Sequence, residues 1–355
     1  MSQIVRWGIL GTGAIASKFA ADMAHAPSAR LVAVASRKAN NAEDFASRFN
    51  GVRALQSYSE LVSDDEIDAV YIATPNTMHK PHSLMAIAAG KAVLCEKPFA
   101  LSAVEAKEVA DAAREANVFC MEAMWTRFLP VITGLKRLVD AGGIGAPSYL
   151  HASLGFRTPD DPQNRFNSPQ LGGGALLDLG VYGVSMAHFF LGAPTGVSAQ
   201  ARFGSTGVDR QIVAMLQYDD CTATIAASHD TELSNGLEIV GATGRIEVAP
   251  SFLQATKASL IAFNARPTTS PGPEGTAKAI LKRFGLWPLA RAIALTALRR
   301  NDRQVRGAFA GDGYQFEIEE VARALTSGAK ESELMPLDET IAVMETLDRI
   351  RAAAS

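Results

Sequence analysis

The sequence predicts an α/β domain built on a doubly wound parallel sheet, followed by an α+β domain with a large, mostly antiparallel open sheet. Two patterns lead to this prediction. Over residues 1–125, short apolar segments alternate with Ala-rich segments of helical periodicity, as in parallel strands covered by helices on both faces. From about residue 147, β-segments follow one another through short turns such as Asp219-Asp220, as in an antiparallel sheet.

Within the first domain, each apolar run is short enough for one strand and is followed by a helical segment. Ser102 and Glu105 form a capping box at the start of one such helix. The expected strands are residues 4–10, 31–36, 68–75, 92–98 and 118–124, and the expected helices cover 15–25, 77–89 and 102–116.

The sheet of the second domain is expected to be covered on both faces, by helices on one and by a partner subunit on the other. Its strands carry apolar or small residues on both faces, such as Ile212 and Ala214 against Val213 and Met215. The expected strands are residues 147–156, 197–203, 210–218, 221–229 and 237–248, and two late helices cover 313–327 and 337–353.

These patterns divide the chain into three parts. Residues 1–125 form the first domain, 126–336 the second, and 337–355 a C-terminal helix near the domain junction. Residues 267–311 begin Pro-, Gly- and Thr-rich and then become basic and helical, which indicates an insert. For this insert, a surface helix packed on the protein is favoured over a helix that lies on a membrane or a partner.

Charge and composition narrow the class of protein. The chain has 355 residues, a net charge of −3 and a pI near 6.1, which gives no reason to expect nucleic acid or an anionic membrane as partner. No apolar run approaches the roughly 20 residues that span a bilayer. The N-terminal residues lack a signal-peptide pattern, and the three cysteines are widely spaced. A reducing, cytoplasmic setting is therefore expected.

A glycine-rich turn near the N-terminus has the pattern of a dinucleotide-binding loop. Gly11-x-Gly13-x-x-Ala16 follows a predicted strand and begins a helix. Gly11 permits a tight turn, Gly13 lets a pyrophosphate approach the backbone, and the helix N-terminus offers free N–H groups. At the end of the second strand, Ser36 and Arg37 stand where an NAD-binding protein usually carries a carboxylate. NADP is therefore favoured over NAD.

Two further polar motifs follow parallel strands and should lie at the same edge of the sheet. Ligands of open α/β sheets bind beyond the carboxyl ends of the strands, so these motifs are expected beside the cofactor. Asn76 is also a good N-cap for the helix that follows it. The two motifs are Thr74-Pro75-Asn76 and Glu96-Lys97-Pro98.

Five stretches of the chain carry a resemblance to a known family. They are GILGTGAIA, ATPNTMH, CEKPFAL, EAMWTRF and GGGALLDLGVY. Over essentially its whole length the chain resembles the Gfo/Idh/MocA family of NAD(P)-dependent oxidoreductases. The most specific feature is Glu-Lys-Pro combined with Asp178-x-x-x-Tyr182, where much of the family has His in place of Tyr. EAMWTRF and GGGALLDLGVY are most similar to the branch that contains dimeric dihydrodiol dehydrogenase and NADP-dependent D-xylose 1-dehydrogenase.

The resemblance implies a Rossmann domain, a homodimer, and hydride transfer between the nicotinamide and a CH–OH carbon of a sugar or cyclic polyhydroxyl compound. The cofactor supplies the hydride chemistry, and the protein supplies a proton acceptor and a polarising charge. Lys97 is expected to polarise the substrate oxygen and Tyr182 to exchange its proton, with the pKa of each lowered. Asp178 would orient Lys97 or bind a hydroxyl. The family also implies a cis peptide before Pro98.

Further contacts are assigned on the same grounds. Arg157 and Arg165 lie in a polar loop that could close over a polyol. His79 and His82 are three residues apart but lack a carboxylate cluster, so no metal is expected. The expected cofactor contacts are Gly11, Thr12, Gly13, Ala14, Ile15, Ser36, Arg37, Thr74, Pro75, Asn76, His79, Glu96, Lys97, Trp125 and Arg127, and the expected substrate contacts are Lys97, Asp178, Tyr182, Arg157 and Arg165.

Three other functions stay open at the level of sequence. A nucleotide-sensing regulator of the same fold would not need Lys97, Asp178 and Tyr182, so their presence argues against it. A glycosidase that uses bound NAD as a transient oxidant is disfavoured by the basic end of the second strand. A sugar-nucleotide oxidoreductase would use the polar loop and the basic insert to bind phosphate.

Overall fold

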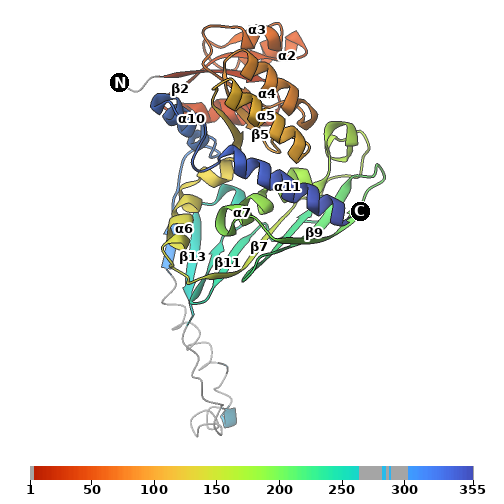
Figure 1. Cartoon of the computed structure of the whole chain (residues 1–355), viewed down its shortest axis with the longest axis vertical. Helices are drawn as coiled ribbons and strands as arrows, with labels where there is room; N and C mark the ends of the chain where they lie inside the picture. Colours follow the sequence, from red (N-terminus) through yellow and green to blue (C-terminus); the bar gives the residue numbers. More distant parts are fainter. Residues whose placement is uncertain (1–3, 264–281, 285–287, 289–302, 355) are drawn as a thin grey trace.

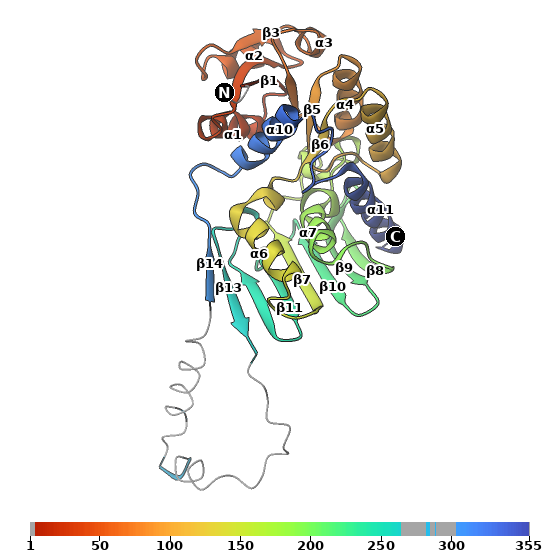
Figure 2. The same ribbon diagram turned by 60° about the vertical axis from the view of Figure 1, so that its left-hand side comes forward.

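The first domain is a parallel six-stranded sheet with α1 and α10 on one side and α4 and α5 on the other (Figures 1 and 2). The computed structural model describes residues 4–263, 282–284, 288 and 303–354. The strand order is β3-β2-β1-β4-β5-β6, so the order reverses between β1 and β4. The strands are β1 (Val5–Leu10), β2 (Ala29–Ala35), β3 (Arg53–Leu55), β4 (Ala69–Ile72), β5 (Ala92–Glu96) and β6 (Cys120–Ala123). The helices are α1 (Ala14–Asp22), α2 (Ala39–Ala46), α3 (Tyr58–Val62), α4 (His79–Ala88), α5 (Ala103–Glu115) and, from the end of the chain, α10 (Gln315–Ser327).

The five strands expected in this domain are confirmed, while β3 was missed because it is only three residues long. The capping box is also confirmed, since Ser102 Oγ accepts a hydrogen bond from the Glu105 N–H at 3.3 Å. The assignment of Asn76 as an N-cap is wrong. Its side-chain amide donates instead to the Gly172 carbonyl at 3.0 Å, because a loop of the second domain lies against it.

The second domain is an eight-stranded sheet of order β14-β13-β12-β11-β7-β10-β9-β8. Only β7 and β10 pair in parallel, so the mostly antiparallel sheet is confirmed for the part of the chain that the structure describes. The strands are β7 (Pro147–Gly155), β8 (Gly196–Phe203), β9 (Asp209–Gln217), β10 (Thr222–Ser228), β11 (Leu237–Gly241), β12 (Gly244–Val248), β13 (Lys257–Ala262) and β14 (Arg303–Arg306). The remaining helices are α6 (Pro130–Asp140), α7 (Val181–Leu191) and α11 (Leu337–Ala354).

Strand β14 corrects part of the predicted basic helical insert. Residues 303–306 were assigned to that insert, but they pair with β13 at the edge of the sheet. The sequence Arg303-Gln304-Val305-Arg306 has only one apolar residue and no strand period, so the strand forms through its pairing with β13 and not through a local preference. Most of the insert at 267–311 lies outside the described residues.

Helices α6, α7 and α11 lie on one face of the eight-stranded sheet (Figure 2). The two faces of β9 therefore differ in exposure. Ile212 and Ala214 are buried under the helices, while Val213 and Met215 are 51% and 39% exposed on the other face. Within the described residues, this chain leaves that second face open. The stretch Pro169–Leu191 is apolar and long enough to span a bilayer, contrary to the expectation from sequence, but 89% of its most apolar window is buried inside the protein.

Helix α11 lies across the junction of the two domains, where it packs against α5 and α7 (Figure 1). Its Asp348 accepts the N–H of Ala103 at 2.8 Å and so caps α5. A second connection joins Asp22 of α1 to the loop before α10, where Asp22 accepts the N–H of Gly313 and of Tyr314 at 2.8 and 2.9 Å. The first contact joins α11 to α5, and the second joins α1 to the loop that leads from β14 into α10.

Candidate active site

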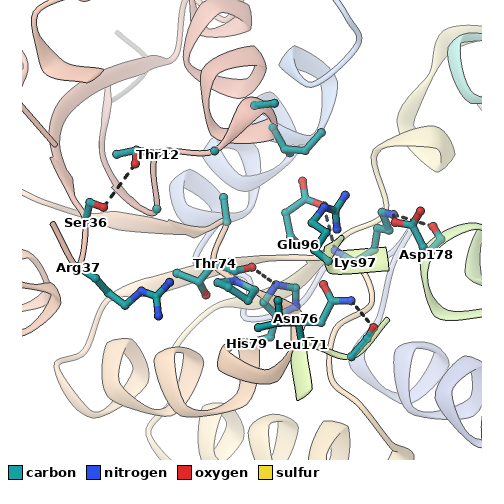
Figure 3. A pocket seen from close by; sticks show the side chains of 18 of the residues that line it. Thr12, Ser36, Arg37, Thr74, Asn76, His79, Glu96, Lys97, Leu171 and Asp178 are labelled. Atoms are coloured by element: carbon teal, nitrogen blue, oxygen red, sulfur yellow. Dashed lines mark hydrogen bonds and ion pairs between the residues drawn. The ribbon is translucent and has the colours of Figure 1, made fainter. Parts of the chain in front are cut away.

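A cavity of about 370 Å³ lies at the carboxyl ends of β1, β4 and β5, where the loop after β7 meets the first domain. Ser36 and Arg37 lie toward one end, and Lys97 and Asp178 lie toward the other (Figure 3). Most of the residues predicted to contact the cofactor line this cavity. They are Gly11, Thr12, Gly13, Ala14, Ile15, Ser36, Arg37, Thr74, Pro75, Asn76, His79, Glu96 and Lys97.

The glycine-rich turn fits a pyrophosphate group. Gly11 has φ +106°, and a Cβ there would lie 2.5 Å from the Ala73 carbonyl oxygen, so only glycine can close this turn. A Cβ on Gly13 would meet no described atom within 4 Å, so its backbone opens into the cavity. Gly13 is the N-cap of α1 and brings no capping side chain, which leaves the first N–H groups of the helix for an anionic ligand.

The end of the cavity beyond β2 is polar and basic. Thr12 Oγ1 donates to Ser36 Oγ at 3.4 Å, and Arg37 follows directly (Figure 3). Arg37 lies close to Tyr58 and His82. Burial lowers the pKa of His82, and the positive charge of Arg37 lowers it further. Burial raises the pKa of Tyr58, and the charge of Arg37 partly offsets this rise. The side chains at this end therefore suit a phosphorylated ribose.

His79 joins the loop after β4 to the Glu-Lys-Pro turn. Its Nδ1 lies 2.7 Å from the Pro98 carbonyl oxygen and its Nε2 lies 2.9 Å from the Thr74 carbonyl oxygen. Burial lowers the pKa of His79 to about 4, against the opposite effect of the two carbonyl groups. The expected cis peptide between Lys97 and Pro98 is present. The neutral imidazole has one N–H, so it donates to one of these two carbonyl groups, and a proton on Nδ1 would join the start of α4 to the Glu-Lys-Pro turn.

Lys97 and Asp178 meet at the other end of the cavity (Figure 3). The Lys97 Nζ donates to the Asp178 carbonyl oxygen at 2.8 Å and lies 3.4 Å from its Oδ1. Asp178 belongs to a π-helical turn, Leu176–Gly180, that runs into α7. Such turns are frequent at functional sites because the wider turn redirects side chains.

The ionisation of Lys97 differs from the sequence-based expectation. Burial lowers the pKa of Lys97, but Tyr182, Asp178 and Glu96 outweigh burial and raise it above the ordinary value. Burial raises the pKa of Asp178, but Lys97 and Arg165 outweigh burial and lower it. A positively charged nicotinamide would lower the pKa of Lys97, whereas the negative groups of this chain raise it. Lys97 and Asp178 therefore form an ion pair at neutral pH.

Tyr182 lies one side chain deeper than the cavity wall. The Lys97 Nζ lies 4.7 Å from the centroid of its ring, and Trp125 Nε1 donates to its hydroxyl oxygen at 3.0 Å. Burial raises the pKa of Tyr182 to about 12, despite the opposing effect of Lys97. The predicted lowering of this pKa is therefore wrong, because burial outweighs the neighbouring charge.

Trp125 and Arg127 are not among the described residues that line the cavity. The indole of Trp125 binds Tyr182 and stacks on Tyr314 with ring centroids 5.0 Å apart. Arg127 is fully buried, donates to Ser185 Oγ at 2.7 Å and pairs with Glu339 at 2.7 Å. In this structure Trp125 bonds Tyr182, and Arg127 joins the 3₁₀ turn Trp125–Phe128 to α7 and α11, so both cofactor contacts stay predictions.

The two arginines of the polar loop are separated by the fold. Arg165 lines the cavity, and its guanidinium lies 4.0 Å from the centroid of the Phe166 ring. Arg157 lies elsewhere, at a second hollow that it shares with Arg202 and Arg210. Only Arg165 is therefore placed to contact a ligand of the cavity.

Sequence analysis missed several residues at or beside the cavity. Tyr58 follows the short strand β3, which was not recognised, and Phe166, Leu171 and Gly172 belong to a loop without a periodic pattern. His229, just after β10, lies 3.6 Å from Asp178. No local pattern points to His229, because its place beside Asp178 depends on the parallel pairing of β10 with β7.

Two family models match the chain. The model of the oxidoreductase family with an NAD-binding Rossmann fold matches residues 5–124, and the model of the GFO/IDH/MocA C-terminal domain matches residues 132–247. Trans-1,2-dihydrobenzene-1,2-diol dehydrogenase of Mus musculus is 33% identical over 98% of this chain and 96% of the mouse protein. The protein of the same name from Homo sapiens is 31% identical over the same shares.

Solved structures share the fold over almost the whole chain. A 3-ketoreductase from Actinomadura kijaniata in complex with NADP and TDP-benzene has a TM-score of 0.79 and 24% identity, over 99% of this chain and 98% of that one. An aldose-aldose oxidoreductase from Caulobacter crescentus complexed with glycerol has a TM-score of 0.79 and 20% identity over the same shares. Together with the family models and the close relatives, the described cavity establishes that this chain belongs to the Gfo/Idh/MocA family of NAD(P)-dependent oxidoreductases.

Proposed function

We propose that this protein is an NADP-dependent dehydrogenase that oxidises a CH–OH group of a cyclic diol or a sugar, and reduces the corresponding carbonyl. The observation that carries the proposal is a single cavity with a dinucleotide cradle at Gly11 and Gly13 and an ion pair of Lys97 and Asp178. When bound, the nicotinamide would accept or supply the hydride. The names of the relatives support a trans-dihydrodiol as the first substrate to test.

In this proposal the residues of the chain bind the substrate oxygen and move its proton. The Lys97 ammonium has three N–H donors, and the carbonyl oxygen and Oδ1 of Asp178 accept two of them. The ammonium is thereby held in place, and its third donor can polarise the substrate oxygen. Tyr182 exchanges the proton of that oxygen. Trp125 donates to the Tyr182 hydroxyl, which favours the phenolate and leaves the phenolic proton for the substrate. Arg165 binds a second substrate hydroxyl.

The test of this function is cofactor reduction by the purified protein. NADP⁺ and NAD⁺ would each be offered with benzene trans-dihydrodiol, D-xylose, D-glucose and myo-inositol, and NADPH formation followed by absorbance. We expect turnover of the dihydrodiol or of an aldose with NADP⁺. Tight NADP⁺ binding in calorimetry without turnover of any member would contradict the proposed substrate class and favour a nucleotide-sensing regulator. Protein that purifies with bound NAD would favour a glycosidase.

Replacing Arg37 by alanine is expected to weaken NADP⁺ binding by about 10- to 100-fold, because a charge-assisted contact to the 2′-phosphate is lost. NAD⁺ lacks that phosphate, so its affinity should change less than about threefold. Isothermal titration calorimetry measures both affinities without turnover. Arg48→Ala serves as the control, because Arg48 packs on Phe45 and lies away from the cavity. An equal loss for NADP⁺ and NAD⁺ would contradict the role of Arg37.

We also propose a homodimer through the open face of the eight-stranded sheet. Support comes from exposed Val213 and Met215 in the middle of β9, since solvent-exposed apolar strand faces favour association. Light scattering is expected to give twice the chain mass of 37.6 kDa. Met215→Glu is expected to lower this value to that of a monomer, whereas Val104→Glu on the exposed side of α5 should not. A wild-type monomer at micromolar concentration would contradict the dimer.

A cytoplasmic setting is proposed for the same protein. All three cysteines are free, and Cys95 and Cys120 are buried in the first domain. Free, buried thiols support a reducing compartment.

A further inference from the structure

A buried imidazole lies directly behind the Asp178 carboxylate. His229 follows β10, is 2% exposed, and places its Nε2 3.6 Å from Asp178 Oδ2. Among the residues that the structure describes, neither ring nitrogen meets the geometry of a hydrogen bond, although the Gly174 carbonyl lies close enough to raise the pKa of the ring. A buried polar group without a partner destabilises a fold, so its presence indicates a role that packing does not provide.

The groups that face the ring determine its protonation. Burial lowers the pKa of His229, Arg210 and Arg165 act in the same direction, and Asp178 and the carbonyl of Gly174 act against them. The net fall leaves the imidazole neutral at neutral pH, with one N–H donor and one acceptor nitrogen. A proton on Nε2 directs a donor at the carboxylate, whereas a proton on Nδ1 would direct a lone pair at it.

The backbone and a neighbouring ring fix where the imidazole lies. The His229 N–H donates to the Arg210 carbonyl at 2.7 Å, and its own carbonyl accepts from the Thr158 N–H at 2.9 Å. Phe166 packs on the imidazole with ring centroids 5.0 Å apart, and Phe166 itself lines the cavity. His229 is absent from the described cavity lining, so it can reach a ligand only through the residues in front of it.

We propose that His229 is a positioning residue whose Nε2–H holds one oxygen of Asp178, so that the other oxygen keeps the Lys97 ammonium directed at the substrate. The proposal rests on the oxidoreductase function proposed above. The two carboxylate oxygens face separate side chains: Oδ1 lies 3.4 Å from Lys97 Nζ, and Oδ2 lies 3.6 Å from His229 Nε2, a distance that a small side-chain movement would shorten to a hydrogen bond. Without the imidazole the carboxylate is free to rotate, and Lys97 keeps only the carbonyl contact at 2.8 Å.

The contact between His229 and Asp178 can be tested without turnover. The chain has six histidines, and ring-¹⁵N-labelled histidine would report the tautomer of each in the cofactor-free protein by long-range ¹H–¹⁵N NMR. His229→Gln assigns the signal of His229. We expect the proton on Nε2 at pH 7 and a change of this signal in Asp178→Asn, with the signal of His188 unchanged. A proton on Nδ1, or a signal insensitive to Asp178→Asn, would overturn the proposal.

Kinetics separate positioning from a purely structural role. His229→Phe is expected to lower kcat by about tenfold with KM and NADP⁺ affinity within about threefold, and His229→Gln, which restores a donor, to regain most of kcat. His188→Gln is the control, since His188 is equally buried but bonds Thr346 away from the cavity. An unchanged kcat in His229→Phe would overturn the proposal. Equal losses of kcat in His229→Phe and His229→Gln, with equal falls in their melting temperatures, would also overturn it. If the wild type turns over no substrate of the panel, the proposed function fails, while the NMR result still decides the contact.

Discussion

Replacing Lys97 by methionine is expected to lower kcat/KM by about 10³-fold. Among the described lysines, Lys97 alone contacts Asp178. Its ammonium is the group that polarises the substrate oxygen in the proposed mechanism. Methionine keeps the apolar stem of lysine and removes only the ammonium group, which also makes the contact with the Tyr182 ring. The affinity for NADP⁺ should change less than about threefold, since the dinucleotide cradle lies at the other end of the cavity. Initial rates with the substrate that the proposed panel yields, together with calorimetry, measure both effects.

The control for this change is Lys107→Met. Lys107 is an exposed lysine of α5 that pairs with Asp111 one turn later, so its loss should leave kcat/KM unchanged. Residual activity above about one tenth of wild type in Lys97→Met would contradict the polarising role. A parallel loss of NADP⁺ affinity would instead place Lys97 in cofactor binding.

Lys97, in its ion pair with Asp178, and the buried phenol of Tyr182 determine the protonation of the site before a ligand binds. The pKa of Lys97 is raised, and that of Tyr182 is about 12, so both groups hold their protons at neutral pH. A group that holds its proton can give it to the oxygen of a carbonyl as that oxygen becomes an alcohol. In the proposed mechanism the resting site can therefore supply a proton for reduction, whereas oxidation requires that a proton leave first.

Most of the cofactor end of the cavity could be predicted from the sequence because its determinants are local. Gly11 and Gly13 act within one turn, and Arg37 follows β2 directly, so a pattern of strand, glycine turn and helix identifies them. Lys97 belongs to the same class, since strand ends in an open parallel sheet meet at one edge. The position of these residues at strand ends already places them at the edge of the sheet where the cavity lies.

The remaining corrections concern residues whose role depends on distant parts of the chain. Arg127 is buried and pairs with Glu339, which lies 212 residues later on α11. Asn76 binds a carbonyl of the second domain, 96 residues away, instead of capping a helix. His229 shows the same limit, because its relation to Asp178 exists only once β10 lies beside β7. No local pattern in the sequence reports such pairings.

Replacing Tyr182 by phenylalanine is expected to lower kcat/KM for alcohol oxidation by about 10²- to 10³-fold and to abolish its dependence on pH. In the wild type, oxidation needs the phenolate, and the pKa of about 12 lies well above the assay range. The rate should therefore rise about tenfold per pH unit between about pH 7 and pH 10, while reduction of the carbonyl, which needs the neutral phenol, stays level over that range. In Tyr182→Phe this rise should disappear, and reduction should be slow throughout.

The matched control is Tyr218→Phe. The slope of the pH profile decides which group accepts the substrate proton. Tyr218 is a partly buried tyrosine just after β9 whose hydroxyl has no partner among the described residues, so its loss should leave the profile unchanged. If Tyr182→Phe is slow yet keeps the rise with pH, a different group accepts the proton. Lys97 would then be that group, because its nitrogen is the other proton carrier held by Asp178 at the same end of the cavity. In that case Tyr182 would act only by stabilising the lysine through its ring and its hydroxyl.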